Sequence, residues 1–273
     1  MSLIIDFHTH CFPDSLAEKA INKLMERAQN KPYTDGTLKD TYRILDEWNT
    51  DYAVSCNIAV LPKSVAKVND FAIVSDGGRI ISFGSAHPFA DNSESELERI
   101  KAAGLKGIKL HPEYQDFDVH IPEAIKIYKK CAQLDLIVLI HSGKDIAYPD
   151  SLRAAPEYLR EISVKSPYTK FVFAHMGGEW CWEGVIKYVA GLDNVWLDTA
   201  YSACSMDREM FKRVAEKHGL DKILYATDLP WDSGINTQQY INNMGYTKEE
   251  KDGIMYLNAL KLLGGINGCK EKV

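Results

Sequence analysis

The sequence predicts an α/β fold, a closed (β/α)8 TIM barrel that forms a single domain over residues 1–273. Short apolar segments, several of them rich in β-branched residues, alternate along the chain with longer amphipathic segments, as expected for a parallel sheet buried on both faces. Eight such strand–helix units in about 250 residues match the size of this barrel. An open doubly wound sheet is the alternative, but that fold predicts a G-x-G-x-x-G turn, which the sequence does not contain.

Each predicted strand is a short apolar segment, and the helices are the amphipathic segments between them. Glycines follow three of these helices, where the left-handed backbone of a C-cap favours them: Gly104, Gly191 and Gly219. Residues 30–37, which include Pro32 and Gly36, are predicted to form a loop insertion. The strands are expected at residues 3–8, 52–60, 80–86, 106–111, 136–141, 170–175, 194–199 and 222–228. The helices are expected at residues 15–29, 64–75, 93–103, 122–134, 156–164, 182–190, 208–218 and 248–263.

The composition excludes several classes of partner. The net charge is −6 and the sequence pI is about 5.8, and no block of like charge suggests binding to nucleic acid or to an anionic membrane. No apolar run reaches the roughly 18 residues of a membrane span. No signal peptide is recognisable, so we expect a cytoplasmic protein whose six cysteines are free thiols: Cys11, Cys56, Cys131, Cys181, Cys204 and Cys269. Assembly into a homo-oligomer is left open.

The most informative pattern is that four predicted strands end in residues that bind divalent cations. The first strand ends in His8 and His10, which project to the same side because side chains alternate along a strand. His141, His175 and Asp228 end the strands at 136–141, 170–175 and 222–228. In a closed barrel these ends converge on one point, where the active site of this fold lies. We therefore expect a metal centre there.

Imidazole and carboxylate ligands suit Zn²⁺, with Mn²⁺ and Fe²⁺ as alternatives. A catalytic site keeps one position open for water, and the cation lowers the pKa of that water from 15.7 to about 7. A carboxylate at the metal can accept the proton of the water, and a neighbouring histidine can polarise the substrate or hold a proton. The sequence thus indicates a metal-dependent enzyme that acts on a small molecule.

At its strand ends the chain resembles the amidohydrolase superfamily, specifically its amidohydrolase-2 branch of single-barrel enzymes. The resemblance implies that His8, His10, His141 and Asp228 bind one ion, that His175 is the catalytic histidine beside it, and that Asp228 also handles a proton. The matching motifs are DFHTH at 6–10, GIKLHP at 107–112, IHSG at 140–143, AHMGG at 174–178 and ATDLPW at 226–231.

The resemblance does not fix the reaction, because the branch contains both hydrolases and non-oxidative decarboxylases. The preferred hypothesis is hydrolysis of an ester, lactone or amide carbonyl. The first alternative is decarboxylation of an aromatic or unsaturated acid, which requires a cationic grip on a carboxylate from Arg153, Arg208 or Lys109. The second alternative is a barrel that binds a ligand without catalysis.

Further residues are candidates for substrate binding. Lys109 shares its predicted strand with His111 and points the same way. We expect Lys109 to pair with an acid or to bind a substrate carboxylate; the alternative is a carboxylated lysine that bridges two metals. His111 ends that strand, and Arg153 and Trp180 follow two later predicted strands; all three are expected near the substrate. Asp6 is either a hydrogen-bond partner of a ligand histidine or a structural acid.

Overall fold

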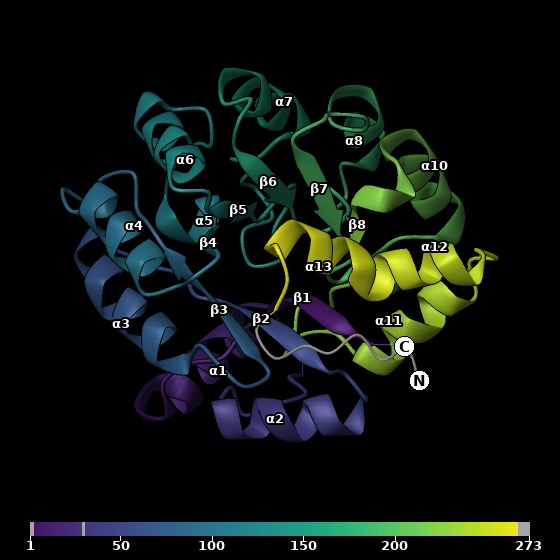
Figure 1. Cartoon of the computed structure of the whole chain (residues 1–273), viewed down its shortest axis with the longest axis horizontal. Helices are drawn as coiled ribbons and strands as arrows, with labels where there is room; N and C mark the ends of the chain where they lie inside the picture. The colour runs from purple at the N-terminus through teal and green to yellow at the C-terminus, as the bar shows by residue number, and fades with distance from the viewer. Residues whose placement is uncertain (1–2, 29–30, 267–273) are drawn as a thin grey trace.

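The computed structural model describes residues 3–28 and 31–266. Eight parallel strands follow one another in chain order around a single sheet, with the helices packed outside it (Figure 1). This architecture confirms the predicted TIM barrel, and each strand lies within or beside its expected range. The strands are β1 (Ile5–Thr9), β2 (Tyr52–Cys56), β3 (Ile80–Ser85), β4 (Gly107–Leu110), β5 (Ile137–Ile140), β6 (Lys170–Phe173), β7 (Val195–Asp198) and β8 (Ile223–Leu224).

Hydrogen bonds between the first and last strands close the barrel. The backbone N–H of Phe7 donates to the carbonyl oxygen of Tyr225 at 2.9 Å, and that of Asp228 donates to the carbonyl oxygen of His8 at 2.9 Å. The buried carboxylate of Asp6 adds a side-chain link, because it accepts from Thr227 Oγ1 at 2.6 Å and from the Thr227 backbone N–H at 3.0 Å. Asp6 also accepts from the backbone N–H of His8 at 3.2 Å, so it contacts a predicted ligand histidine through the backbone and links the barrel seam through its side chain.

Helices fill the connections between the strands, and no described helix is long and apolar enough to cross a membrane. Two of the longer helices were not predicted, α2 and α11. The helix expected at 248–263 is interrupted by a π-helical turn at Gly253–Leu257. The helices are α1 (Asp14–Ala28), α2 (Leu38–Glu47), α3 (Val65–Ser75), α4 (Ser93–Ala102), α5 (Pro112–Gln115), α6 (Pro122–Gln133), α7 (Pro156–Lys165), α8 (Trp182–Tyr188), α9 (Ser202–Ser205), α10 (Arg208–His218), α11 (Gly234–Asn242), α12 (Lys248–Asp252) and α13 (Asn258–Leu263).

The missed helix α2 has a clear local signal. Thr37 caps its N-terminus by accepting a hydrogen bond from the backbone N–H of Asp40. Its apolar face packs through Leu45 against Ala53 of β2 and Ile80 of β3. This helix covers the outside of the barrel, so α1, which precedes it, is an additional helix between β1 and β2.

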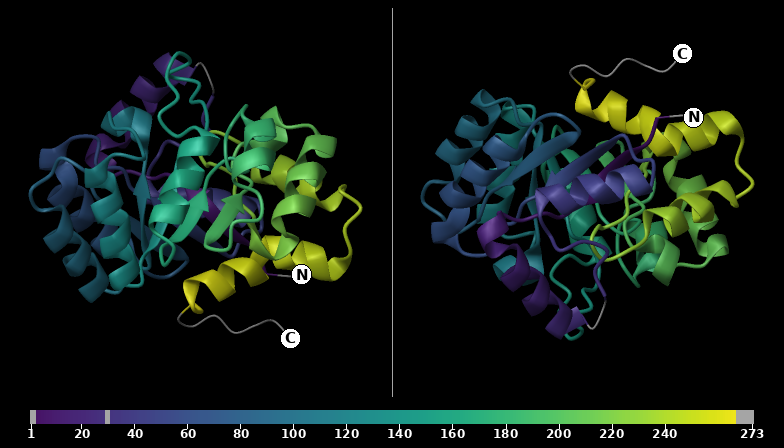
Figure 2. Two further views of the ribbon diagram at one scale, coloured as in Figure 1. Left: turned by 90° about the horizontal axis from the view of Figure 1, so that it is seen from above. Right: turned by 90° about the horizontal axis from the view of Figure 1, so that it is seen from below.

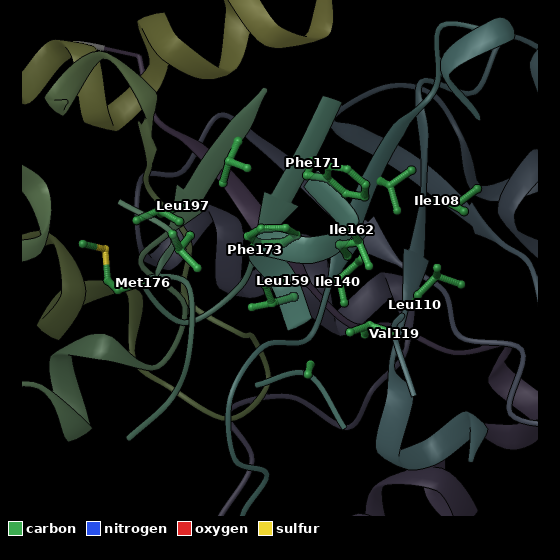
Figure 3. Close-up of a cluster of buried hydrophobic side chains, with 14 of the residues drawn as sticks. Ile108, Leu110, Val119, Ile140, Leu159, Ile162, Phe171, Phe173, Met176 and Leu197 are labelled. Carbon is green, nitrogen blue, oxygen red and sulfur yellow. The ribbon is translucent and has the colours of Figure 1, made fainter. Parts of the chain in front are cut away.

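The core has two layers, one inside the barrel and one between the strands and the helices. Along β5, Leu139 packs in the inner layer and Ile140 in the outer one, as the two-residue period of a strand requires. Figure 3 shows the outer layer, where Ile140 lies near Leu159 and Ile162 of α7. On β4 the same period sends Ile108 and Leu110 outward, so Lys109 between them points inward.

The described cysteines are free thiols, as predicted: Cys11, Cys56, Cys131, Cys181 and Cys204. Cys269 lies outside the described residues. The Sγ atom of Cys11 is 3.0 Å from Ser55 Oγ, and the thiol and the hydroxyl form a hydrogen bond.

If Asp6 helps to close the barrel, two Thr→Val substitutions should lower the free energy of unfolding by unequal amounts. Thr227→Val removes the hydroxyl donor of a buried carboxylate and should lower the free energy of unfolding by about 3 kcal/mol. Thr169→Val removes a buried hydroxyl that donates to the carbonyl oxygen of Tyr128 within α6, a neutral acceptor, and should cost about 1 kcal/mol. Urea-induced unfolding measures both, and equal losses would contradict the role of Asp6 in closure.

Candidate metal centre

A cavity of about 500 Å³ opens at the carboxyl ends of the strands. All five predicted strand-end residues line it: His8, His10, His141, His175 and Asp228. Figure 2 shows α1 and the C-terminal helix α13 at opposite ends of the barrel. The additional helix α1 and the region around α3 give the cavity an apolar wall, which contains Phe12, Leu16, Leu24, Val60, Val68 and Phe71.

His8 and His10 present the same ring nitrogen to Asp228. His8 Nδ1 donates to Asp198 Oδ2 at 3.0 Å, and His10 Nδ1 donates to the carbonyl oxygen of Cys56 at 2.9 Å. Each bond places the ring proton on Nδ1 and leaves a lone pair on Nε2. Both Nε2 atoms face Asp228 Oδ1, at 3.4 Å from His8 and 3.2 Å from His10. Burial holds the pKa of His8 well below its ordinary value, which keeps this imidazole neutral.

These three side chains fit a divalent cation. Ligand atoms lie about 2.0–2.2 Å from a tetrahedral zinc ion, which sets them about 3.3 Å apart. The distances from Asp228 Oδ1 to the two Nε2 atoms, 3.4 and 3.2 Å, have this spacing. Neutral imidazoles and a carboxylate are also the donors that catalytic zinc sites use. His8, His10 and Asp228 would therefore hold the ion.

The structure does not place His141, the fourth predicted ligand, in this group. His175 Nδ1 donates to the carbonyl oxygen of Ala200 at 3.0 Å, which leaves a lone pair on His175 Nε2. His141 Nδ1 lies 3.0 Å from that lone pair and donates to it. The physical reason for the difference is that two neutral imidazoles at this distance satisfy each other. The ring of His175 is 5.5 Å from that of His8, so the pair still borders the metal centre.

A second cluster of metal-binding residue types, His111, His141 and Asp145, lies in the same cavity. The rings of His111 and His141 are stacked, with centroids 4.1 Å apart and an interplanar angle of 11°. The lone pairs of imidazole lie in the ring plane. Two parallel, stacked rings therefore direct their lone pairs within two separate parallel planes and not at one ion. Asp145 Oδ2 lies 3.2 Å from His111 Nε2 and 3.8 Å from His141 Nε2. This cluster is therefore a stack of two imidazoles with a carboxylate at its edge.

Lys109 is fully buried beside the metal centre. Its Nζ lies 2.9 Å from His8 Nε2, and burial lowers the pKa of this amine. Among the described ion pairs none involves Lys109, so the expected pairing with an acid is not found. Lys109 does line the cavity, where it can reach the substrate or a second ion.

The remaining predicted residues divide between the cavity and its surroundings. His111 and Trp180 line the cavity. Arg153 does not: its guanidinium pairs with Asp116 and Asp118, and its backbone N–H donates to Glu113. The prediction that Arg153 contacts the substrate therefore does not agree with its position, because neighbouring carboxylates hold the side chain outside.

Sequence reasoning missed two acidic residues of the site. Asp198 orients His8 through its side chain and also accepts the backbone N–H of His175 at 2.9 Å. It ends the apolar run of β7, which is the same signal that identified Asp228, so it was open to prediction. Glu179 lines the cavity from the loop after β6, and nothing in the local sequence distinguishes it from a solvated loop residue.

Backbone strain is concentrated at this end of the barrel. Among described residues other than glycine, five with positive φ follow β6, β7 or β8: His175 (59°), Met176 (52°), Trp180 (53°), Tyr201 (61°) and Asp228 (67°). The left-handed region is unfavourable for residues with a Cβ, and such residues gather at functional sites. At His175 the turn directs the ring into the cavity, although regular alternation would send it outward with Phe173.

The comparison with known protein families agrees with this geometry. Residues 5–265 match the model of the family described as amidohydrolase. The chain belongs to this family. No curated protein matches it.

Solved structures with the same fold cover nearly the whole chain. A candidate amidohydrolase from Staphylococcus aureus is 18% identical, with a TM-score of 0.73, and the match covers 96% of this chain and 99% of that one. A 2,6-dihydroxybenzoate decarboxylase from Rhizobium is 14% identical, with a TM-score of 0.71 and 97% and 99% covered. A dihydroxybenzoic acid decarboxylase from Polaromonas, solved with bound manganese, is 15% identical, with a TM-score of 0.71 and 97% of each chain covered. At these identities the likeness establishes the fold.

The contact between His8 and Asp198 predicts a loss of metal affinity in Asp198→Asn. An amide is a weaker acceptor than a carboxylate for the Nδ1 proton of His8, so Nε2 becomes a poorer ligand. We expect the affinity for Zn²⁺ to fall about 10- to 100-fold, measured by competition with a fluorescent chelator. Asp193→Asn, at an exposed position before β7, is the control. Equal affinities in the two variants would contradict the role of Asp198.

The neutral imidazoles predict that acid releases the metal. Protons compete with the ion for the Nε2 lone pairs as the pH falls, and binding shifts the release below the ordinary titration of histidine. We expect full occupancy at pH 7 and a decline below roughly pH 5–6. Elemental analysis after dialysis at each pH measures it, with circular dichroism to verify that the protein remains folded. Full occupancy at pH 4 would indicate oxygen ligands.

Proposed function

We propose that this chain is a metal-dependent hydrolase that cleaves an ester, lactone or amide bond of a small, largely apolar molecule. The observation that carries the proposal is the convergence of the Nε2 atoms of His8 and His10 on Asp228 at the floor of an apolar cavity. We propose zinc as the metal because the donor set is rich in imidazole, with manganese as the alternative. A bound ion would supply a water of lowered pKa and would polarise the substrate carbonyl.

The residues around that water have complementary roles. The carboxylate of Asp228 is partly exposed to the cavity, so it takes the proton of the attacking water and passes it to the leaving oxygen or nitrogen. His175 has its Nδ1 proton committed to Ala200, so its Nε2 would accept a proton from the reacting groups once His141, which donates to it in this structure, turns towards the ion. The proton that it takes is the one that the carboxylic acid product loses at neutral pH, whereas Asp228 carries the other from water to the leaving group. These two residues account for the proton balance of hydrolysis.

Decarboxylation is the second candidate, and the decarboxylases from Rhizobium and Polaromonas favour it. Such an enzyme must hold a carboxylate with a cation. No arginine lines the cavity within the described part of the chain, and Arg153 is occupied by two aspartates. Lysines do line the cavity: Lys109, which is fully buried beside His8, and the more exposed Lys23, Lys67 and Lys144. The decarboxylase alternative therefore depends on a lysine. Hydrolysis requires no such grip and fits the cavity better.

A screen for product chemistry tests the proposal. The purified protein, loaded with Zn²⁺ or Mn²⁺, is incubated with small esters, lactones, amides and aromatic acids. Acid release detected with a pH indicator supports hydrolysis, and release of CO₂ in a coupled assay supports the second candidate. His8→Ala/His10→Ala is the control and should abolish either activity together with the metal. Activity that persists in this metal-free variant would overturn the proposal, and turnover of none of these compounds would favour a non-catalytic barrel. Two ions per chain by elemental analysis would bring Lys109 into the metal site.

His175→Asn should separate catalysis from metal binding. Asparagine is smaller and still polar, but it cannot accept the proton that His175 takes at Nε2. We expect kcat to fall by about 10²–10⁴ with the metal retained, the usual contribution of a positioned acid–base group. Steady-state kinetics and elemental analysis on the same preparation measure the two effects.

His141→Asn is the matched comparison. If His141 moves to the ion when it binds, as the family resemblance implies, the substitution should lose metal and activity together. If His175→Asn loses the metal instead, His175 is a ligand and Asp228 alone handles the proton.

A further inference from the structure

Glu179 is a buried carboxyl group without a partner. The residue is 3% exposed, and neither Oε1 nor Oε2 has a hydrogen-bond partner. The hydroxyl of Ser205 is close enough to lower the pKa of this carboxyl group as a hydrogen-bond donor, but in this structure it donates to the carbonyl oxygen of Tyr201 at 3.1 Å. Burial raises the pKa of Glu179 to about 8. An unsatisfied buried polar group costs free energy, so its retention at a cavity wall points to a ligand that completes it.

The backbone around Glu179 holds this side chain in place. Its N–H donates to the carbonyl oxygen of Ser142 at 2.9 Å, and its carbonyl oxygen accepts from the N–H of Lys144 at 3.0 Å. Between these bonds lies Gly143, with φ of +82°, where an added Cβ would sit 2.2 Å from the Glu179 nitrogen. The loop after β5 and the loop after β6 are thus joined at Glu179, which forms part of the cavity wall.

The surroundings of Glu179 favour a cation. Asp228 and Asp232 are the charged groups that act on it, and both are negative. None of the described ion pairs joins Glu179 to a lysine, arginine or histidine. A metal ion would balance Asp228 but not Glu179. Trp180 and Trp231 also line the cavity, and aromatic faces attract cations.

We infer that Glu179 forms a subsite for a positively charged nitrogen, so that the substrate is an amine-bearing ester, lactone or amide. The ammonium group would donate to Glu179 while the carbonyl lies at the metal. The inference rests on the proposed function for the carbonyl but on Glu179 alone for the amine. A probe without a cleavable bond therefore tests it independently.

The probe is benzylamine, with benzyl alcohol as its neutral counterpart. Each is titrated into the protein at pH 8.5, where Glu179 is mostly ionised and benzylamine is still mostly protonated. Binding is followed by tryptophan fluorescence, since Trp180 is adjacent to Glu179 and 44% exposed. Benzylamine should bind more tightly than benzyl alcohol. In Glu179→Gln its Kd should rise about 10- to 100-fold, the range for a lost hydrogen bond to a charged group, while the Kd of benzyl alcohol should not change.

Glu183→Gln is the matched control, because Glu183 is 68% exposed and pairs with Arg213 on the surface. It should leave both Kd values unchanged. Thermal unfolding verifies that Glu179→Gln is folded, which is expected because the substitution keeps the shape and removes an unpaired acid. Unchanged binding of benzylamine in Glu179→Gln would overturn the inference. So would loss of benzylamine binding only in His8→Ala/His10→Ala, which would place the amine at the metal.

Discussion

The closure of the barrel between its first and last strands is the constraint on which the site depends. His8 and His10 stand at one end of the chain and Asp228 lies far along it, yet the backbone of Asp228 bonds directly to that of His8. The buried link from Asp6 to Thr227 holds the same seam one step below. Without that seam the carboxylate and the two imidazoles would not share one ion.

The second requirement is that each ligand presents a lone pair. A neutral imidazole has one proton and two nitrogens, so an acceptor must fix the proton on the far side. Asp198 does this for His8 and the Cys56 carbonyl does it for His10. The same principle at His175, through Ala200, leaves a lone pair on its Nε2. The hydrogen bonds behind the rings thus determine which nitrogen each ring presents to the cavity.

The cavity has different chemistry at its two sides, and this is where specificity would arise. The floor holds the metal ligands, whereas the outer wall, built largely by the additional helix α1 and by the region of α3, is apolar. Glu179 interrupts the apolar and aromatic lining with a buried acid. Relatives that share the floor but differ in these walls would bind different substrates. Membership in the amidohydrolase family therefore does not define the substrate of this chain.

The sequence by itself determined the barrel and its metal-binding strand ends, because buried parallel strands must be apolar and the polar residue that ends each one is conspicuous. Lys109 and Asp198 carried the same local signal, one within a strand and one at its end. Only the tertiary structure decided how the histidines are grouped. It paired His141 with His175 and stacked it on His111, and it moved Arg153 out of the site. Ring orientation, hydrogen-bond partners and the isolation of Glu179 depend on neighbours that are distant in the chain, so no local pattern can encode them.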